Sequence, residues 1–180
     1  MSTIPNLKLG QHGCLEGTVF LSPWMGYASQ EMRETNMVSD GHVTLFLGGM
    51  DEKDDNTVVT PEQVAACEYA IQEAEHIQRV ILDNLFVYYH NSEDIKAFRK
   101  GMELAAQFYG PPPEDAEPML PDITGPEQFK SLIALLAVSI IKAGVEGQSK
   151  VVYRFASWDI EHSLDVIMLR DQVLHIGYVG

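Results

Sequence analysis

Short runs of β-branched and aromatic residues at both ends of the chain predict strands. In the segment 42–47, Val43, Leu45 and Leu47 occupy every second position, which is the period of a strand with one face buried. Turn-forming residues separate this segment from its neighbours. The same reasoning predicts strands at residues 14–21, 42–47, 137–142, 150–158, 164–169 and 173–178. Short turns join the last four of these, so we expect an antiparallel meander there.

The period changes to three and four between residues 60 and 91, which predicts a long helix. Thr60 is placed to cap this helix, Pro61 fits the first helical position, and Gln63 completes a capping box. One apolar stripe then continues over about seven turns. The stripe consists of Val64, Cys67, Ile71, Ala74, Ile77, Ile81, Leu85 and Tyr88.

A second helix follows directly, with Ser92 as its cap and the prolines of 110–113 as its end. Its apolar side consists of Ile95, Phe98, Met102, Ala105, Ala106 and Tyr109. The two helices together form a helical hairpin, and the acidic segment 110–121 is interpreted as a surface loop. A third, shorter helix is expected to begin at 124–127. Its apolar residues are Phe129, Leu132, Ile133 and Leu136.

These elements predict an α+β fold. We expect an antiparallel sheet formed from the N- and C-terminal strands, with the helical hairpin and the short third helix packed on one face. A chain of 180 residues suits a single domain, so the domain is expected to span residues 1–180. The helical segment 60–110 is then inserted between the N-terminal strands and the C-terminal meander.

The chain is strongly acidic, with 26 Asp and Glu against 12 Lys and Arg and a formal net charge of −14. Such a surface repels phosphate groups, so neither nucleic acid nor a membrane surface is expected as a partner. A basic protein is the partner that this charge favours, while self-association is left open. Residues 1–6 lack the features of a secretory signal and no long apolar segment follows, so we expect a cytoplasmic protein.

The densest cluster of reactive side chains lies where the predicted strand 150–158 is connected to the predicted strand 164–169. It contains Trp158, Asp159, Glu161 and His162. Two carboxylates and an imidazole can act as general acid and base, or bind a divalent cation. Alternatively the turn is architectural: Asp159 closes it, Trp158 covers the end of the core, and His162 pairs with a carboxylate. We favour the architectural interpretation, and expect neither a metal nor a cofactor.

The pattern Phe-x-x-Trp-Asp-x-Glu-His at residues 155–162 resembles that of a widespread bacterial domain family without assigned activity. Two further features fit the family pattern: the turn that contains Arg170 and Asp171, and the C-terminal sequence Val-x-x-Ile-Gly at residues 173–177. Members of that family are small acidic cytoplasmic proteins, and some are immunity proteins of polymorphic toxin systems. The resemblance therefore implies a protein that neutralises a toxin. It is sharpest over 150–177, weaker over 51–89, and absent over 110–121.

Two positions depart from the family pattern. Ala156 and Ser157 stand where the family usually has a cysteine, which argues against a thiol or thiolate-metal role at this turn. Ser163 stands where the family has a glycine after the histidine, which indicates that the backbone here does not require a positive φ.

A loop after the first long strand contains Trp24, Met25 and Tyr27, which are residue types that dominate binding hot spots. We treat these three as candidates for partner contact, with burial in the core as the alternative. Cys14 and Cys67 have no metal-ligating neighbours at a suitable spacing, and are interpreted as buried hydrophobic residues.

Two classes of function follow from these observations. The first is an acidic binding protein of the immunity type, which binds and neutralises a basic protein such as a toxin. The second is an enzyme or metal-dependent sensor that uses Asp159, Glu161 and His162. We favour binding, because the candidate catalytic residues do not make a complete mechanism; an assembly subunit is the third alternative.

Overall fold

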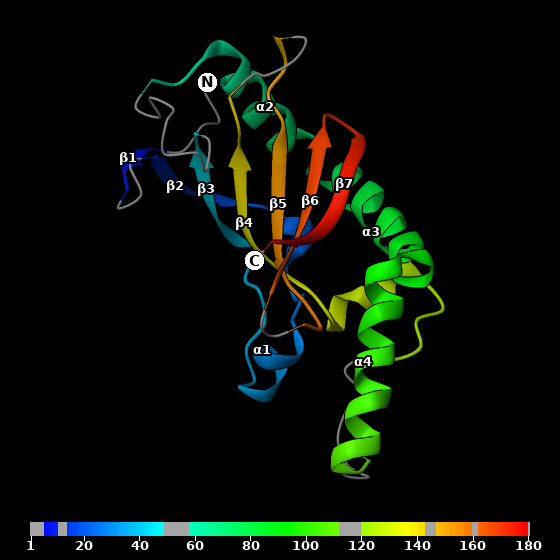
Figure 1. Cartoon of the computed structure of the whole chain (residues 1–180). Coiled ribbons are helices and arrows are strands. Elements are labelled where there is room, and N and C mark those ends of the chain that lie inside the picture. Colours follow the sequence, from blue (N-terminus) through cyan, green and yellow to red (C-terminus); the bar gives the residue numbers. More distant parts are fainter. Residues whose placement is uncertain are drawn as a thin grey trace.

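The computed structural model describes residues 6–10, 14–48, 58–111, 120–142, 147–159 and 162–179. Its strands form one sheet in the order of the sequence, and α2 and α3 cover one face of that sheet (Figure 1). The strands are β1 Lys8–Leu9, β2 Leu15–Phe20, β3 His42–Leu47, β4 Ala134–Ile140, β5 Val151–Ala156, β6 Ser163–Leu169 and β7 Gln172–Val179. The helices are η1 Ser22–Trp24, α1 Gln30–Glu34, α2 Pro61–Gln72, α3 Ala74–Asn91, α4 Glu93–Tyr109 and η2 Pro126–Ser131, where η marks a 3₁₀ helix.

The predicted fold class is confirmed: the chain is α+β, with a mostly antiparallel sheet built from both ends of the chain. The meander β4–β5–β6–β7 is antiparallel throughout. The acidic run 51–56, most of the loop 110–121 and the candidate residue Glu161 lie outside the described residues.

One pair of strands differs from the antiparallel prediction. β3 and β4 run parallel, with Thr44 opposite Ala137 and Leu47 opposite Ile140. Parallel neighbours cannot be joined by a tight turn and need a long crossover, which is usually helical. The segment between β3 and β4 contains α2, α3 and α4, so the inserted helices are themselves this crossover.

The helix expected over 60–91 is interrupted at Glu73, which adopts φ −99° and ψ 21° between α2 and α3. α2 packs against β4, whereas α3 packs against β7 and both 3₁₀ helices. An unbroken helix of this span would be about 45 Å long, compared with a width of roughly 30 Å for seven strands. The interruption therefore allows each half to contact a different part of the sheet.

The third predicted helix is a short 3₁₀ helix, and Leu136 lies instead in β4, where its side chain is exposed. The expected strand start at residue 137 was late, because β4 begins at Ala134. Nearly every residue of β4 is buried, so this strand shows a continuous apolar run without the alternation that marks a half-buried strand.

The core lies between the sheet and the apolar stripes of α2 and α3. These helices and strands bury Cys67, Ile77, Ile81, Leu85, Leu45, Val138, Tyr153, Phe155, Leu164 and Val166. Burial raises the pKa of the Cys67 thiol to about 11, and the charge of Glu68 adds to the shift. Cys67 is therefore a packed core residue, as the sequence indicated.

Gln63 fixes the start of α2 to the end of β4. Its Oε1 accepts a hydrogen bond from the Thr60 backbone N–H at 3.0 Å, and Thr60 Oγ1 accepts one from the Gln63 N–H at 3.3 Å, which completes the predicted capping box. Its Nε2 donates to the Ile140 carbonyl oxygen at 3.0 Å. The Ile140 carbonyl oxygen also accepts from the Gly48 N–H at 3.1 Å, so the buried Gln63 side chain provides one of its two donors.

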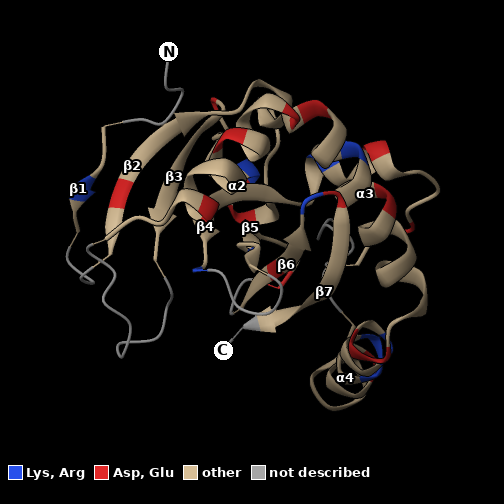
Figure 2. Cartoon of the chain, turned by 90° about the horizontal axis from the view of Figure 1, so that it is seen from above, with Lys and Arg blue, Asp and Glu red and all other residues tan. Residues whose placement is uncertain are grey.

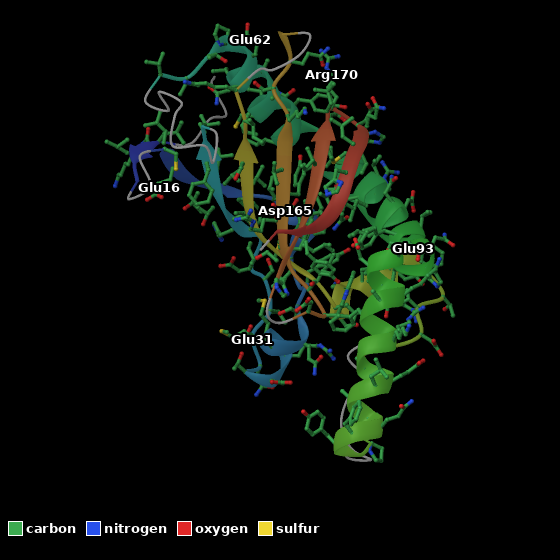
Figure 3. All side chains as sticks on the ribbon, in the orientation of Figure 1. Glu16, Glu31, Glu62, Glu93, Asp165 and Arg170 are labelled. Atoms are coloured by element: carbon green, nitrogen blue, oxygen red, sulfur yellow. The ribbon has the colours of Figure 1, made fainter. Side chains whose placement is uncertain are left out.

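The sheet face opposite α2 and α3 carries an ion pair between neighbouring strands. Arg154 Nε and Nη2 lie 2.9 and 2.8 Å from the two carboxylate oxygens of Asp165, and the two residues are opposite each other on β5 and β6. Hydrogen bonding to Asp165 raises the pKa of the Arg154 guanidinium. Asp165 is only 3% exposed and lies near the middle of the sheet (Figure 3), so the pair fixes the register of these strands.

The first prediction concerns the link between α2 and β4. Replacing Gln63→Ala removes the side-chain half of the capping box and one of the two donors to the Ile140 carbonyl oxygen, so the free energy of unfolding should fall by about 1–2 kcal/mol. Urea denaturation measures this. Gln72→Ala, an exposed position on the same helix, is the matched control and should change stability little; equal effects of the two substitutions would show that Gln63 does not make this link.

Candidate functional site

Trp158 lies wholly in the core at the end of β5. Its ring packs edge-on against Tyr89 of α3, with centroids 5.1 Å apart, and contacts Phe129 of η2 at 6.1 Å. The indole Nε1–H donates a 2.7 Å hydrogen bond to the hydroxyl of Tyr178 on β7. Trp158 thus joins the end of β5 to α3, to η2 and to the edge strand, and it does not form the wall of an open site.

Asp159 and His162 lie beside this tryptophan at the surface. His162 Nδ1 is 3.1 Å from Asp159 Oδ2, and the Asp159 backbone N–H donates to Ser157 Oγ at 3.3 Å. The His162 side chain is half exposed, whereas Asp159 is largely covered. Glu161 lies outside the described residues. These contacts are the ones expected of an architectural turn, in which the imidazole pairs with a carboxylate and the short loop is closed locally.

The tyrosines around Trp158 form a polar layer over the aromatic core. Tyr88 donates its hydroxyl proton to Asp94 Oδ2 at 2.9 Å, which joins the end of α3 to the first turn of α4. Burial, aided by this bond, raises the pKa of Tyr88. Burial also raises the pKa of Tyr178 to about 12, with the charges of Asp159 and Asp94 adding to the shift. Both hydroxyls therefore stay neutral over the physiological range of pH.

The first turns of α4 are attached to the body through this layer. Ser92 Oγ accepts the Ile95 N–H at 3.2 Å, and the Ile95 side chain is fully buried. The Arg99 guanidinium lies 5.3 Å from the centroid of the Tyr89 ring, which is a cation–π contact. Tyr89 also donates to the Pro121 carbonyl oxygen at 2.7 Å. The same tyrosine thus contacts Trp158 on one side and Arg99 of α4 on another.

Beyond these contacts α4 leaves the body of the protein, and its C-terminal end lies apart from the sheet (Figure 1). We call residues 102–109 the α4 arm. Its apolar side chains include Leu104, Phe108 and Tyr109, which are 45%, 81% and 91% exposed. Of the predicted apolar side of this helix, Ile95 is fully buried, Phe98, Met102 and Ala106 are partly buried, and Ala105 and Tyr109 are exposed.

Of the three loop residues proposed for partner contact, only Met25 is exposed. Trp24 is 1% exposed, and its ring packs against Tyr27 and Phe155 with centroids 5.1 Å away in both cases. Tyr27 is buried as well. The loop thus belongs to the core, because its aromatic side chains fill the space between η1 and β5.

The outer surface of α2 and α3 is acidic. Residues 61–91 contain five Asp and Glu against one Arg, and the acidic positions lie along both helices (Figure 2). The acids are Glu62, Glu68, Glu73, Glu75 and Asp83. In contrast, α4 balances three acids with three bases, and its arm carries a single charged residue, Glu103. The negative potential of the hairpin therefore originates from α2 and α3.

Residues 16–180 match the family described as Domain of unknown function (DUF6985). The chain belongs to the DUF6985 family. The match includes all described elements after β1, so the Trp158 turn, the acidic helices and the α4 arm are parts of a DUF6985 domain. No curated protein and no solved structure matches the chain.

Two further observations bear on the site of this DUF6985 chain. Within the described ranges, no group of three or more His, Cys, Asp and Glu side chains could hold a metal ion. None of the helices in the described part of the chain is long and apolar enough to cross a membrane.

The exposure of the arm was not predicted. The spacing of Met102, Ala105, Ala106 and Tyr109 fits a helix packed on a core, and periodicity alone does not show whether a core lies beside it. A signal was present in Phe108, which falls outside the stripe and makes the last turn apolar on two sides.

The second prediction tests the role of Tyr178 as the partner of Trp158. Tyr178→Phe leaves the buried indole N–H without an acceptor, so the free energy of unfolding should fall by about 1–3 kcal/mol in a urea denaturation experiment. Tyr109→Phe removes a hydroxyl that is exposed to water and should leave stability unchanged. Equal stability of the two variants would contradict the architectural role of the Trp158–Tyr178 contact.

Proposed function

We propose that this DUF6985 chain is a protein-binding module whose α4 arm contacts a partner protein with a basic surface. The observation that carries the proposal is the exposure of Leu104, Phe108 and Tyr109 on one projecting helix end. Burying an apolar side chain of this size stabilises a complex by about 1.5–3 kcal/mol. Aromatic side chains are also the most frequent hot spots of protein interfaces.

Charge supports a basic partner. The formal net charge is −14, and residues 61–91, which include α2 and α3, carry five acids against one Arg. The sequence that follows the arm, residues 110–121, adds three acids and no base. A cationic protein would thus be attracted over a distance of about 8 Å at physiological ionic strength, and the weakly charged arm would then make the close contacts.

The resemblance to immunity proteins supports a more specific version of this proposal, in which the partner is a toxin domain that the chain neutralises. An immunity protein needs fast association, because its target is harmful from the moment it folds. Electrostatic attraction between an acidic inhibitor and a basic enzyme raises association rates for this physical reason.

The catalytic alternative has less support. Trp158 is fully buried, and the Asp159–His162 pair is formed by local contacts within one turn. Two clefts in the described part of the chain, of about 310 and 320 Å³, are lined by other residues. A site for catalysis would need further polar groups that converge on the pair from other strands.

The third prediction tests the arm directly. The purified product of the adjacent gene, if basic, serves as the probe in surface plasmon resonance against the chain. Phe108→Ser combined with Tyr109→Ser should weaken binding by about 30-fold, which corresponds to about 2 kcal/mol. The association rate constant of the unaltered chain should fall by roughly tenfold between low and physiological salt.

Met25→Ser is the matched control for this measurement. It removes an exposed apolar side chain from the other candidate contact surface and should leave the affinity unchanged. A larger loss from Met25→Ser than from the arm variant would place the contact at the loop. Unchanged affinity in the arm variant, with an association rate that salt does not affect, would refute the proposed function.

A further inference from the structure

A cleft of about 310 Å³ lies where α2, the residues before β5 and the β6–β7 turn meet. One side of α2 forms the first wall, and the second wall comes from residues 147–151. The polar groups at this cleft include Glu62, Tyr69, Ser149 and Arg170, and its apolar surface includes Ala65, Ala66 and Val151. This volume lies at the lower end of the range for sites that bind small molecules.

Two opposite charges line the cleft. Glu62 lies in the first turn of α2 and Arg170 in the turn between β6 and β7, at the same end of the molecule (Figure 3). Among the described residues, neither has an ion-pair partner within 4.0 Å, whereas the adjacent Asp171 lies 4.0 Å from His76.

The spacing of α2 gives the approximate length of the ligand. Glu62 and Tyr69 both line the cleft and are seven residues apart, which is about 10 Å along the helix axis. Arg170 lies close enough to Tyr69 for its charge to act on the tyrosine hydroxyl. We infer from this spacing a ligand about as long as three extended residues.

Ser149 is a buried polar residue in the lining of the cleft. It is 5% exposed, and within the described part of the chain its Oγ makes no hydrogen bond. A buried hydroxyl without a hydrogen bond lowers the stability of the fold, so a hydrogen bond from a bound ligand would stabilise it. A ligand with a peptide group at this position would provide one.

Arg170 is also held in an unusual backbone conformation. Its φ of +54° lies in the left-handed region, which glycine adopts readily and other residues adopt at a cost. Strain of this kind persists where a side chain serves a purpose that glycine cannot fulfil. Arg170, in this conformation, is one of the residues that line the cleft.

We propose that this cleft binds a short peptide with free termini, of two or three residues. The Glu62 carboxylate binds the N-terminal ammonium group of the peptide, and the Arg170 guanidinium binds its C-terminal carboxylate. The small side chains between the two termini pack against the apolar wall that α2 and Val151 form. Ser149 Oγ hydrogen-bonds a peptide group. A free amino acid carries its two charges on one carbon and is too short to reach both ends. The cleft is separate from the α4 arm, so this inference stands independently of the proposed function.

The fourth prediction uses trialanine as the probe and backbone amide shifts of the ¹⁵N-labelled chain as the readout. Trialanine should bind with a dissociation constant on the order of 1 mM and shift the amides of Gly147–Val151 and Arg170. N-acetyl-trialanine and trialanine amide each lack one charge and should bind roughly tenfold more weakly. Free alanine should not shift these amides.

Variants separate binding from folding. Ser149→Ala should weaken trialanine binding about fivefold without loss of thermal stability, because the hydroxyl has no hydrogen-bond partner among the residues that the structure describes. Arg170→Gly should abolish measurable binding but raise the melting temperature by about 2–4 °C, because it relieves the positive φ. Glu103→Gln removes an acid from α4, away from the cleft, and should change neither quantity.

Three results would overturn the assignment. The first is that the amide signals of the cleft residues do not shift with trialanine at about ten times the expected dissociation constant. The second is that the capped peptides bind as tightly as trialanine. The third is that free alanine binds as tightly as trialanine. None of these results bears on the α4 arm, whose test uses a protein probe and different variants.

Discussion

The contact between Trp158 and Tyr89 is the interaction on which the rest of the arrangement depends. Trp158 lies two residues after the end of β5, and Tyr89 lies in the last turn of α3, so this contact fixes where the crossover helix meets the sheet. Phe129 and Tyr178 complete the surroundings of the indole, one through its ring and one through its hydroxyl. Because Tyr89 also supports Arg99, the position of the core tryptophan determines where α4 leaves the body.

This geometry gives the parts of the helical segment different surroundings. The apolar stripes of α2 and α3 pack in the core, whereas most of their carboxylates are exposed. α4 begins at the end of α3 and extends away from the sheet, and its last turn exposes Phe108 and Tyr109. Exposed aromatic side chains at a helix end are consistent with the contact surface proposed above. The cleft at Glu62 and Arg170 uses a different part of α2, and its lining residues are not part of the arm.

The sequence predicted what depends on local chemistry. Thr60 and Gln63 form a capping box because their side chains and backbone groups are three residues apart, and Ser92 caps α4 for the same reason. The meander was predictable because short turns leave antiparallel pairing as the one way to join neighbouring strands.

What the sequence did not predict depends on distant contacts. The parallel pairing of β3 with β4 was missed, because an alternating pattern looks the same in either direction. The interruption at Glu73 has no proline or glycine to mark it and follows from the strands that each helix half covers. At the candidate site, Trp158 was recognised as notable. Its partners Tyr89 and Tyr178 come from other elements, and their proximity exists only in the folded chain.

Hydrogen–deuterium exchange of the unaltered chain and of Trp158→Ala tests the central claim most directly. In the unaltered chain, amides of α3 and of the first turn of α4 should be protected, while those of residues 102–109 exchange rapidly. Trp158→Ala should remove protection from the end of α3 and the start of α4 before it affects β4 and β5. Protection of the arm as strong as that of α3, or loss of protection in the sheet while the α3–α4 junction stays protected, would contradict the account.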